Sequence, residues 1–178
     1  MITKELLQRF CNVDRESLAV QFTQGEYTYA SDGRLIVRVP RLDDVPENPD
    51  APKNVAMNIF AATPFRVKED RTPISALTIP PLEGPDDCAN CQGGGIHFCE
   101  ACDDHHDCTR CEGGKVQERA IAVEFKQHKI SHLLLNQIKD LPNVSLAASA
   151  IGMEAALAFF FDGGEGRMMP MRDPEEVK

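Results

Sequence analysis

EYTYASDGRLIVRVP, residues 26–40, carries the strongest fold signal in the chain. Bulky side chains alternate with small or polar ones on both sides of Asp32-Gly33, which is the period of a half-buried β-strand. An Asp-Gly pair favours a tight reversal, because glycine readily adopts the positive φ that such turns require. We therefore expect an antiparallel hairpin here.

The residues before this hairpin predict one helix and one further strand. Thr3 can cap a helix in which Ile2, Leu6 and Phe10 share a face. Over residues 18–23 large apolar side chains recur at every second position, which is the period of a strand, and a Gln-Gly turn leads into the hairpin. The first part of the chain is thus expected to be a helix followed by three antiparallel strands.

A similar pattern returns near the C-terminus. Ile121, Val123 and Phe125 alternate as a strand, and a helix is expected to follow. The apolar face of that helix consists of Ile130, Leu133, Leu134, Ile138 and Leu141, and Pro142-Asn143 ends it. Three more strands are predicted at VSLAAS (144–149), EAALAFFF (154–161) and GRMMPMR (166–172), with Gly163-Gly164 in the turn before the last.

The sequence thus predicts an α+β fold built from two helix-plus-antiparallel-strands units, with halves at about 1–83 and 115–172 of a single domain spanning 1–178. Prolines crowd residues 40–85, where loop is expected apart from short strands at AMNIF (56–60) and ALTI (76–79). Residues 84–114 are expected to be an inserted zinc-binding lobe.

Six of the seven cysteines form three C-x-x-C pairs inside that lobe. Two thiolates on one knuckle can both reach a zinc ion at about 2.3 Å, and two knuckles complete its tetrahedron. Glycines follow the first and third pairs, where a Cβ would obstruct the backbone N–H groups that turn toward sulfur. We therefore assign one zinc to the outer pairs, Cys88, Cys91, Cys108 and Cys111.

The middle pair, Cys99 and Cys102, can form a second zinc site with two of three nearby histidines, which are His97, His105 and His106. A disulfide framework, a thioredoxin-like redox pair and a zinc enzyme with Glu100 or Asp103 as base are the alternatives. Acidic flanks disfavour the redox role, and four cysteines close a zinc shell against substrate. Structural zinc is favoured.

Charge is concentrated in the lobe. The chain carries a net charge of −9, of which residues 84–114 hold −6, with seven acids against one base. Four thiolates on one Zn²⁺ add a formal −2, so the lobe should repel phosphate and attract basic protein surfaces. The chain opens MITKELLQRF without a signal segment and has no apolar run near 20 residues, so we expect a cytoplasmic protein without membrane contact.

Two segments resemble the bacterial DNA polymerase sliding clamp. YASDGRLIVRV resembles the strand, turn and strand that the family writes T-D-G-H-R-L, and GRMMPMR resembles its terminal V-M-P-M-R. The resemblance implies a peptide-binding pocket that includes Met169, Pro170, Met171 and Arg172, and helices that face DNA. The family closes a ring from six such domains whereas this chain has one, which suggests a phage-derived form and leaves a homo-oligomer open.

The second predicted helix also offers a weakly basic stripe that suits phosphate contact. Lys129, His132, Asn136 and Lys139 follow one another at helical spacing, and Lys4 and Arg9 can extend the stripe from the first helix. An ordinary solvated face has the same appearance.

The lobe itself resembles the zinc domain of the DnaJ co-chaperones, whose repeats read C-x-x-C-x-G-x-G. Residues 88–95 fit this repeat in full and residues 108–114 fit its first six positions. That family has four pairs and two zincs, whereas this chain has three pairs. Nothing here resembles the co-chaperone His-Pro-Asp loop, so its function does not transfer.

The sequence thus predicts a non-enzymatic zinc-binding protein of DNA metabolism that binds DNA or a replication partner. The alternative is a zinc-dependent protein-interaction or regulatory protein with no DNA role, and a zinc enzyme is a third reading. One zinc is expected, and the middle pair leaves a second one open.

Overall fold

The computed structural model describes residues 2–48, 59–60, 70–82, 96–99, 102–108, 120–148 and 157–171, apart from the side chains of His97 and Cys99. The chain divides into two compact units. One unit, called the sheet unit below, consists of residues 1–79 and 122–178, and the other, called the lobe, consists of residues 80–121. None of the helices in the described ranges is long and apolar enough to cross a membrane.

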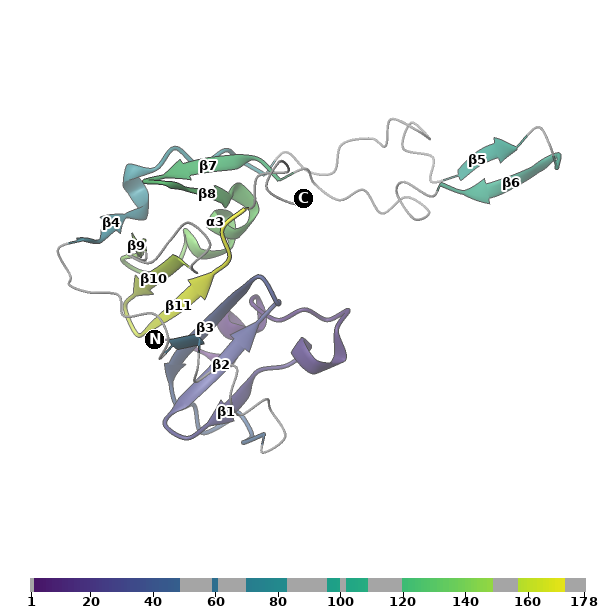
Figure 1. The fold of residues 1–178 in the computed structure, drawn as a ribbon. Helices are drawn as coiled ribbons and strands as arrows, with labels where there is room; N and C mark the ends of the chain where they lie inside the picture. Colours follow the sequence, from purple (N-terminus) through teal and green to yellow (C-terminus); the bar gives the residue numbers. More distant parts are fainter. Residues whose placement is uncertain are drawn as a thin grey trace. The chain divides into compact units, whose positions relative to one another are not determined.

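A seven-stranded antiparallel sheet dominates the sheet unit, in the order β1-β2-β3-β11-β10-β9-β4 (Figure 1). Its strands are β1 (Phe22–Gln24), β2 (Tyr27–Ser31), β3 (Leu35–Pro40), β4 (Thr72–Pro73), β9 (Ser145–Ala147), β10 (Leu157–Phe161) and β11 (Gly164–Met168). The early and late parts of the chain meet at β3 and β11, where Val37 lies opposite Gly166. The sheet is therefore continuous across both sequence halves.

The hairpin predicted around Asp32-Gly33 is confirmed as β2–β3. The Asp32 carboxylate accepts hydrogen bonds from the backbone N–H groups of Arg34 at 2.7 Å and Leu35 at 2.9 Å. Gly33 has a φ of +91°, which glycine adopts without steric cost. Side-chain acceptor and glycine together fix the reversal and hence the pairing of β2 with β3.

Helices are few and short in the described residues. Those with described bounds are α1 (Lys4–Gln8), α3 (His132–Ile138) and the 3-10 turns η1 (Glu16–Leu18) and η3 (Ile74–Ala76). The Thr3 hydroxyl accepts from the Leu6 N–H at the start of α1, and the Ser131 hydroxyl accepts from the Leu133 N–H at the start of α3. A two-stranded hairpin, β7 (Ala122–Phe125) and β8 (His128–Ser131), leads directly into α3.

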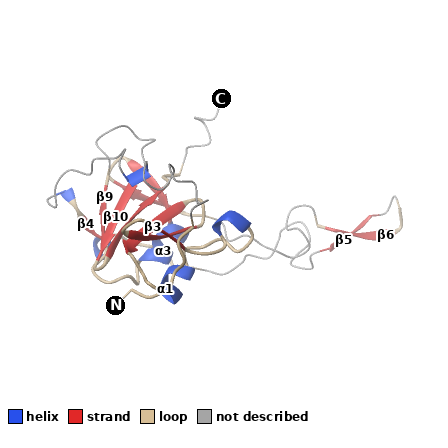
Figure 2. Ribbon diagram, turned by 90° about the horizontal axis from the view of Figure 1, so that it is seen from below, coloured by secondary structure: helices blue, strands red, loops and turns tan. Residues whose placement is uncertain are grey.

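Apolar and polar side chains alternate along the strands, so that one face of the sheet is strongly apolar. Helices α1 and α3 pack on that face (Figure 2). The β7–β8 hairpin contributes Val123, Phe125 and Ile130 to the same core. Buried side chains of this core include Leu7, Phe10, Leu35, Val37, Ile130, Leu135, Ile138, Leu146, Leu157, Phe159 and Met168. A smaller cluster of Tyr29, Ile36 and Phe60 contains the opposite-facing residues of β2 and β3.

The predicted fold class is wrong. The described chain is mostly β, and a single antiparallel sheet replaces the two helix-plus-antiparallel-strands units of the expected DNA-clamp-like domain. The physical reason is the β3–β11 pairing, which merges the strands of both halves into one ladder. Helices α1 and α3 contain only five and seven residues, so they pack on this sheet and do not define units of their own.

Several element boundaries also differ from the sequence patterns. Leu18 belongs to η1 and not to a strand, and Ile130 belongs to β8 and not to the following helix. Ile59 and Phe60 are helical where a strand was expected, and residues 77–79 form no strand. Short apolar runs fit the period of a helix and that of a strand equally well. The strand pairing available in the folded sheet decides which of the two forms.

Candidate metal centre

The described part of the lobe contains a hairpin between the first and third cysteine pairs. Its strands are β5 (Ile96–Cys99) and β6 (Asp104–Asp107). Asp103 in the connecting turn has a φ of +54°, a left-handed conformation that short polar residues tolerate. This reversal brings the middle C-x-x-C pair back toward the two histidines of β6.

Within this turn, the Cys102 Sγ lies 2.9 Å from the His106 Nε2, and both side chains are exposed. Two ligands of one tetrahedral zinc, at about 2.3 Å for sulfur and 2.0 Å for nitrogen, would be separated by about 3.5 Å. Less than 1 Å of side-chain movement converts the observed contact into that spacing. The pair therefore fits one edge of a zinc tetrahedron.

Burial changes abruptly at the start of the third cysteine pair. Residues 102–107 are all exposed, whereas Cys108 is fully buried with 0% exposure. A thiol shielded from water directly after a run of exposed polar residues suits a ligand of a closed zinc shell. The donors in the described part of the lobe, which are thiol sulfur and imidazole nitrogen, are those that zinc prefers.

Several predicted ligands lie outside the described residues. They are Cys88, Cys91 and Cys111, together with the side chains of His97 and Cys99. Among the residues that are described, no group of three or more His, Cys, Asp or Glu side chains is positioned to hold a metal ion. Both zinc assignments thus remain predictions.

Cys11 belongs to the core boundary of the sheet unit. Its Sγ lies 3.9 Å from the Leu7 carbonyl, and burial raises the pKa of its thiol. A raised pKa disfavours the thiolate, so the residue suits packing and not nucleophilic chemistry.

The proposed DNA-contacting residues do not form a continuous exposed stripe. His132 and Asn136 are buried, at 1% and 6% exposure, so α3 presents them to the core. Lys139 caps the helix and donates to the Asn136 side chain at 2.8 Å, whereas Lys129 lies in β8 and is half-buried. Among the outer residues Lys4 is half-buried, and the exposed Arg9 lies 3.9 Å from the Asp140 carboxylate.

The proposed peptide-binding segment follows the end of β11. The Met169 N–H donates to the Arg34 carbonyl at 2.9 Å, and the Met171 N–H donates to the Lys129 carbonyl at 2.7 Å. The Met169 side chain is 61% exposed, whereas Pro170 and Met171 are half-buried. Arg172 lies outside the described residues. The segment is thus held by its backbone and presents one methionine to solvent.

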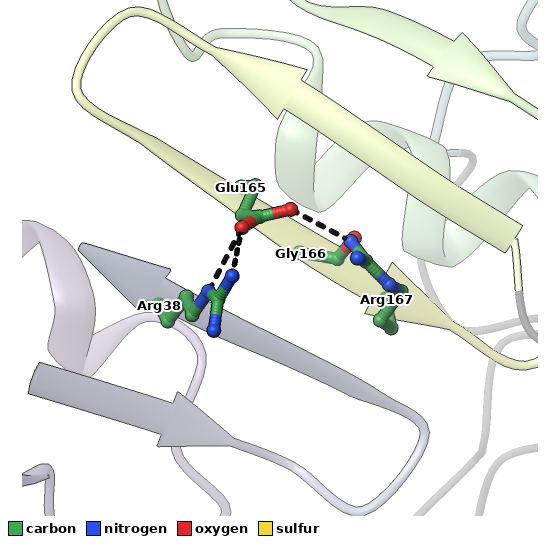
Figure 3. Close-up of polar contacts among 4 residues, drawn as sticks. All are labelled: Arg38, Glu165, Gly166 and Arg167. Atoms are coloured by element: carbon green, nitrogen blue, oxygen red, sulfur yellow. Dashed lines mark hydrogen bonds and ion pairs between the residues drawn. The ribbon is translucent and has the colours of Figure 1, made fainter. Parts of the chain in front are cut away.

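Sequence reasoning missed a charged cluster on the sheet (Figure 3). The Glu165 carboxylate accepts from the Arg38 Nε at 2.9 Å and from the Arg167 Nη1 at 3.1 Å. The Arg38 and Arg167 guanidinium groups lie 4.2 and 4.7 Å from the centroid of the Phe60 ring. The β3–β11 pairing brings Arg38 to Glu165, so no local sequence signal could have revealed this contact.

Arg167 is the most buried member of this cluster, with 4% exposure. Burial lowers the pKa of its guanidinium, and the neighbouring Glu165 carboxylate opposes that shift. The arrangement neutralises a buried charge, which is a structural task.

Comparison with known proteins gave no match, whether the chain was compared with protein-family models, curated proteins or solved structures.

Proposed function

We propose that this chain is a non-enzymatic, cytoplasmic zinc-binding protein that binds a protein partner through its lobe. The observation that carries the proposal is the apolar surface of the β5–β6 hairpin. Ile96 and Phe98 are 48% and 50% exposed, which is unusual for side chains of this size next to a dense acidic sequence. Reduced thiolates for zinc are maintained in the cytoplasm, which supports that location.

The chemistry of the hairpin favours a basic amphipathic segment as the partner. Ile96 lies opposite Asp107 in the hairpin, and Asp103 and Asp104 are also exposed. An apolar strip bordered by carboxylates complements apolar side chains that alternate with Lys or Arg. Nucleic acid is the less favoured partner because phosphate would meet the same carboxylates.

Zinc would supply rigidity in this function. A two-stranded hairpin alone is marginally stable in water, and it has little core of its own to order it. Ligands in the turn and beside the strand ends would restrain both strands, so partner binding is expected to require bound metal.

A random-peptide display library panned on the zinc-loaded chain tests the proposal. We expect enrichment of Lys- or Arg-containing amphipathic peptides. Phe98→Ser should weaken the Kd of one selected peptide by roughly tenfold, since a buried aromatic anchor is worth about 1–2 kcal/mol. Val13→Ser is the matched control, because Val13 is 75% exposed and belongs to the sheet unit. Equal loss for both variants, or enrichment of acidic peptides, would contradict the proposal.

The sliding-clamp resemblance supports a second candidate, which is a replication role through the segment at residues 169–172. The exposed Met169 side chain, held in place by the hydrogen bond to Arg34, is the observation that favours it. Met169→Ser should then abolish binding of apolar peptides from the same library while Phe98→Ser leaves it intact.

A further inference from the structure

We propose that a second zinc ion is held at the middle cysteine pair, with His106 as a ligand and His105 not a ligand. The proposal rests on the zinc-binding function above and specifies a site that the cysteine pattern leaves open. Three histidines lie close to the middle cysteine pair in the sequence, and the hairpin separates them into two groups.

The separation follows from strand register. His97 lies opposite His106, and Cys99 lies opposite Asp104. Directly opposed residues occupy the same face of an antiparallel pair, and successive residues alternate between faces. Positions 97, 99, 104 and 106 therefore share one face of the hairpin.

The other face is formed by positions 96, 98, 105 and 107. The Phe98 and His105 rings meet there edge to face, with their centroids 5.3 Å apart. His105 thus packs on the apolar surface that we propose for partner binding. A ligand role would require its ring to leave Phe98 and cross to the opposite face.

Side-chain contact independently selects His106. The Cys102 Sγ lies 2.9 Å from the His106 Nε2, across the turn that contains Asp103. A thiolate and a neutral imidazole nitrogen at this range are the donors that zinc prefers. Asp104 shares the metal-facing side, but its Oδ1 accepts a hydrogen bond from the His105 N–H at 2.7 Å. Because the Asp104 carboxylate is engaged with the backbone, histidine nitrogen and cysteine sulfur are the better candidates for the zinc ligands.

The ligand type has an electrostatic consequence. Two thiolates and two neutral histidines balance Zn²⁺, whereas a site of four cysteines carries a formal −2. The proposed site adds no further negative charge next to Asp103, Asp104 and Asp107. A neutral site is the composition that an already acidic hairpin tolerates best.

Metal content of the purified full-length chain tests the proposal, with His106→Asn compared with His105→Asn. We expect two zinc ions per wild-type chain, one per His106→Asn chain, and two per His105→Asn chain. Cobalt replacement provides the second readout. Thiolate-to-cobalt charge-transfer absorption and the tetrahedral d–d bands should show an S₂N₂ component that His106→Asn removes and His105→Asn keeps.

The outcomes separate this inference from the function on which it rests. Absence of bound zinc in the wild-type chain would overturn both. One zinc per wild-type chain, with Cys99 and Cys102 readily alkylated, would overturn the second site alone. Equal loss in the two histidine variants would overturn the choice of His106. Cys88→Ser should leave the S₂N₂ component in place, and its disappearance would show that the two sites are not separate.

Discussion

Asp32 carries the turn that joins β2 to β3, because one of its carboxylate oxygens accepts two backbone N–H groups. Asp32→Ala would leave both groups dependent on water in a turn that must stay closed. We expect the free energy of unfolding to fall by about 1 kcal/mol. Urea denaturation followed by tyrosine fluorescence measures this, because the chain has no Trp and its two Tyr both lie in β2.

The turn between β10 and β11 provides a control for that variant. The Asp162 carboxylate accepts from the exposed Asn143 side-chain amide at 2.6 Å, so Asp162→Ala removes a surface contact between side chains. Its effect should be well below that of Asp32→Ala. Equal effects would mean that the Asp32 hydrogen bonds contribute little to the turn.

Gly166 is required because its partner across the strands is a fully buried aromatic ring. Phe159 lies opposite Gly166, and a Cβ built at Gly166 would fall inside the space that this ring occupies. Gly166→Ala should destabilise the sheet unit by about 1–3 kcal/mol through overpacking. The penalty should shrink when the same change is made in a Phe159→Leu background, and an additive double mutant would show that ring contact is not the cause.

At the scale of elements, the β3–β11 junction depends on the charged cluster that spans it. Glu165→Gln would leave the Arg38 and Arg167 guanidinium groups adjacent without a carboxylate between them. Because the Arg167 side chain is only 5% exposed, we expect a loss of about 2 kcal/mol in the free energy of unfolding. The loss should persist in high salt, because the buried charge is poorly screened.

Glu47→Gln is the matched comparison. The Arg41–Glu47 pair lies 3.6 Å apart with both side chains about half exposed, so its contribution should be below about 1 kcal/mol and should vanish in salt. Similar values for Glu47→Gln and Glu165→Gln would show that the cluster on the sheet is energetically no different from a surface pair.

The sequence predicts the local elements of the fold but not the pairing of distant ones. Alternation and turn chemistry are local, so β2, β3 and the turn at Asp32-Gly33 could be recognised from the residues alone. The pairing of Arg38 with Glu165 joins residues 127 positions apart, and single-sequence periodicity contains no information on it. Ile130 fits both a strand and a helix face, and only the β7–β8 hairpin decides between them.

The candidate metal site shows the same limit. C-x-x-C spacing identifies cysteines as ligands because the geometry is local to one knuckle. Three histidines within ten residues are equivalent by that criterion, and only the hairpin register distinguishes His106 from His105. The spacing of the supposed basic stripe likewise gave no indication that His132 would be buried in the core.

At the scale of the whole molecule, the hydrophobic core and the candidate metal ligands belong to different units. The large core cluster in the described residues consists entirely of sheet-unit residues, whereas the cysteine pairs lie in the lobe. The stability of the sheet unit is therefore expected to come from apolar burial and the order of the lobe from metal.

Removal of zinc should consequently affect one unit only. In wild-type chain with a chelator, residues 84–114 should lose protection from amide hydrogen exchange and become sensitive to protease, whereas Cys88→Ser should lose protection only outside the part that the second site orders. The urea midpoint reported by Tyr27 and Tyr29 should stay unchanged, because both residues lie in β2 of the sheet unit. Addition of zinc to the chelated wild-type chain should restore protection of the lobe, whereas Cys88→Ser should recover only the part ordered by the second site. A parallel fall in tyrosine-reported stability would mean that metal and core are coupled, and the lobe could then not be regarded as an independent insertion.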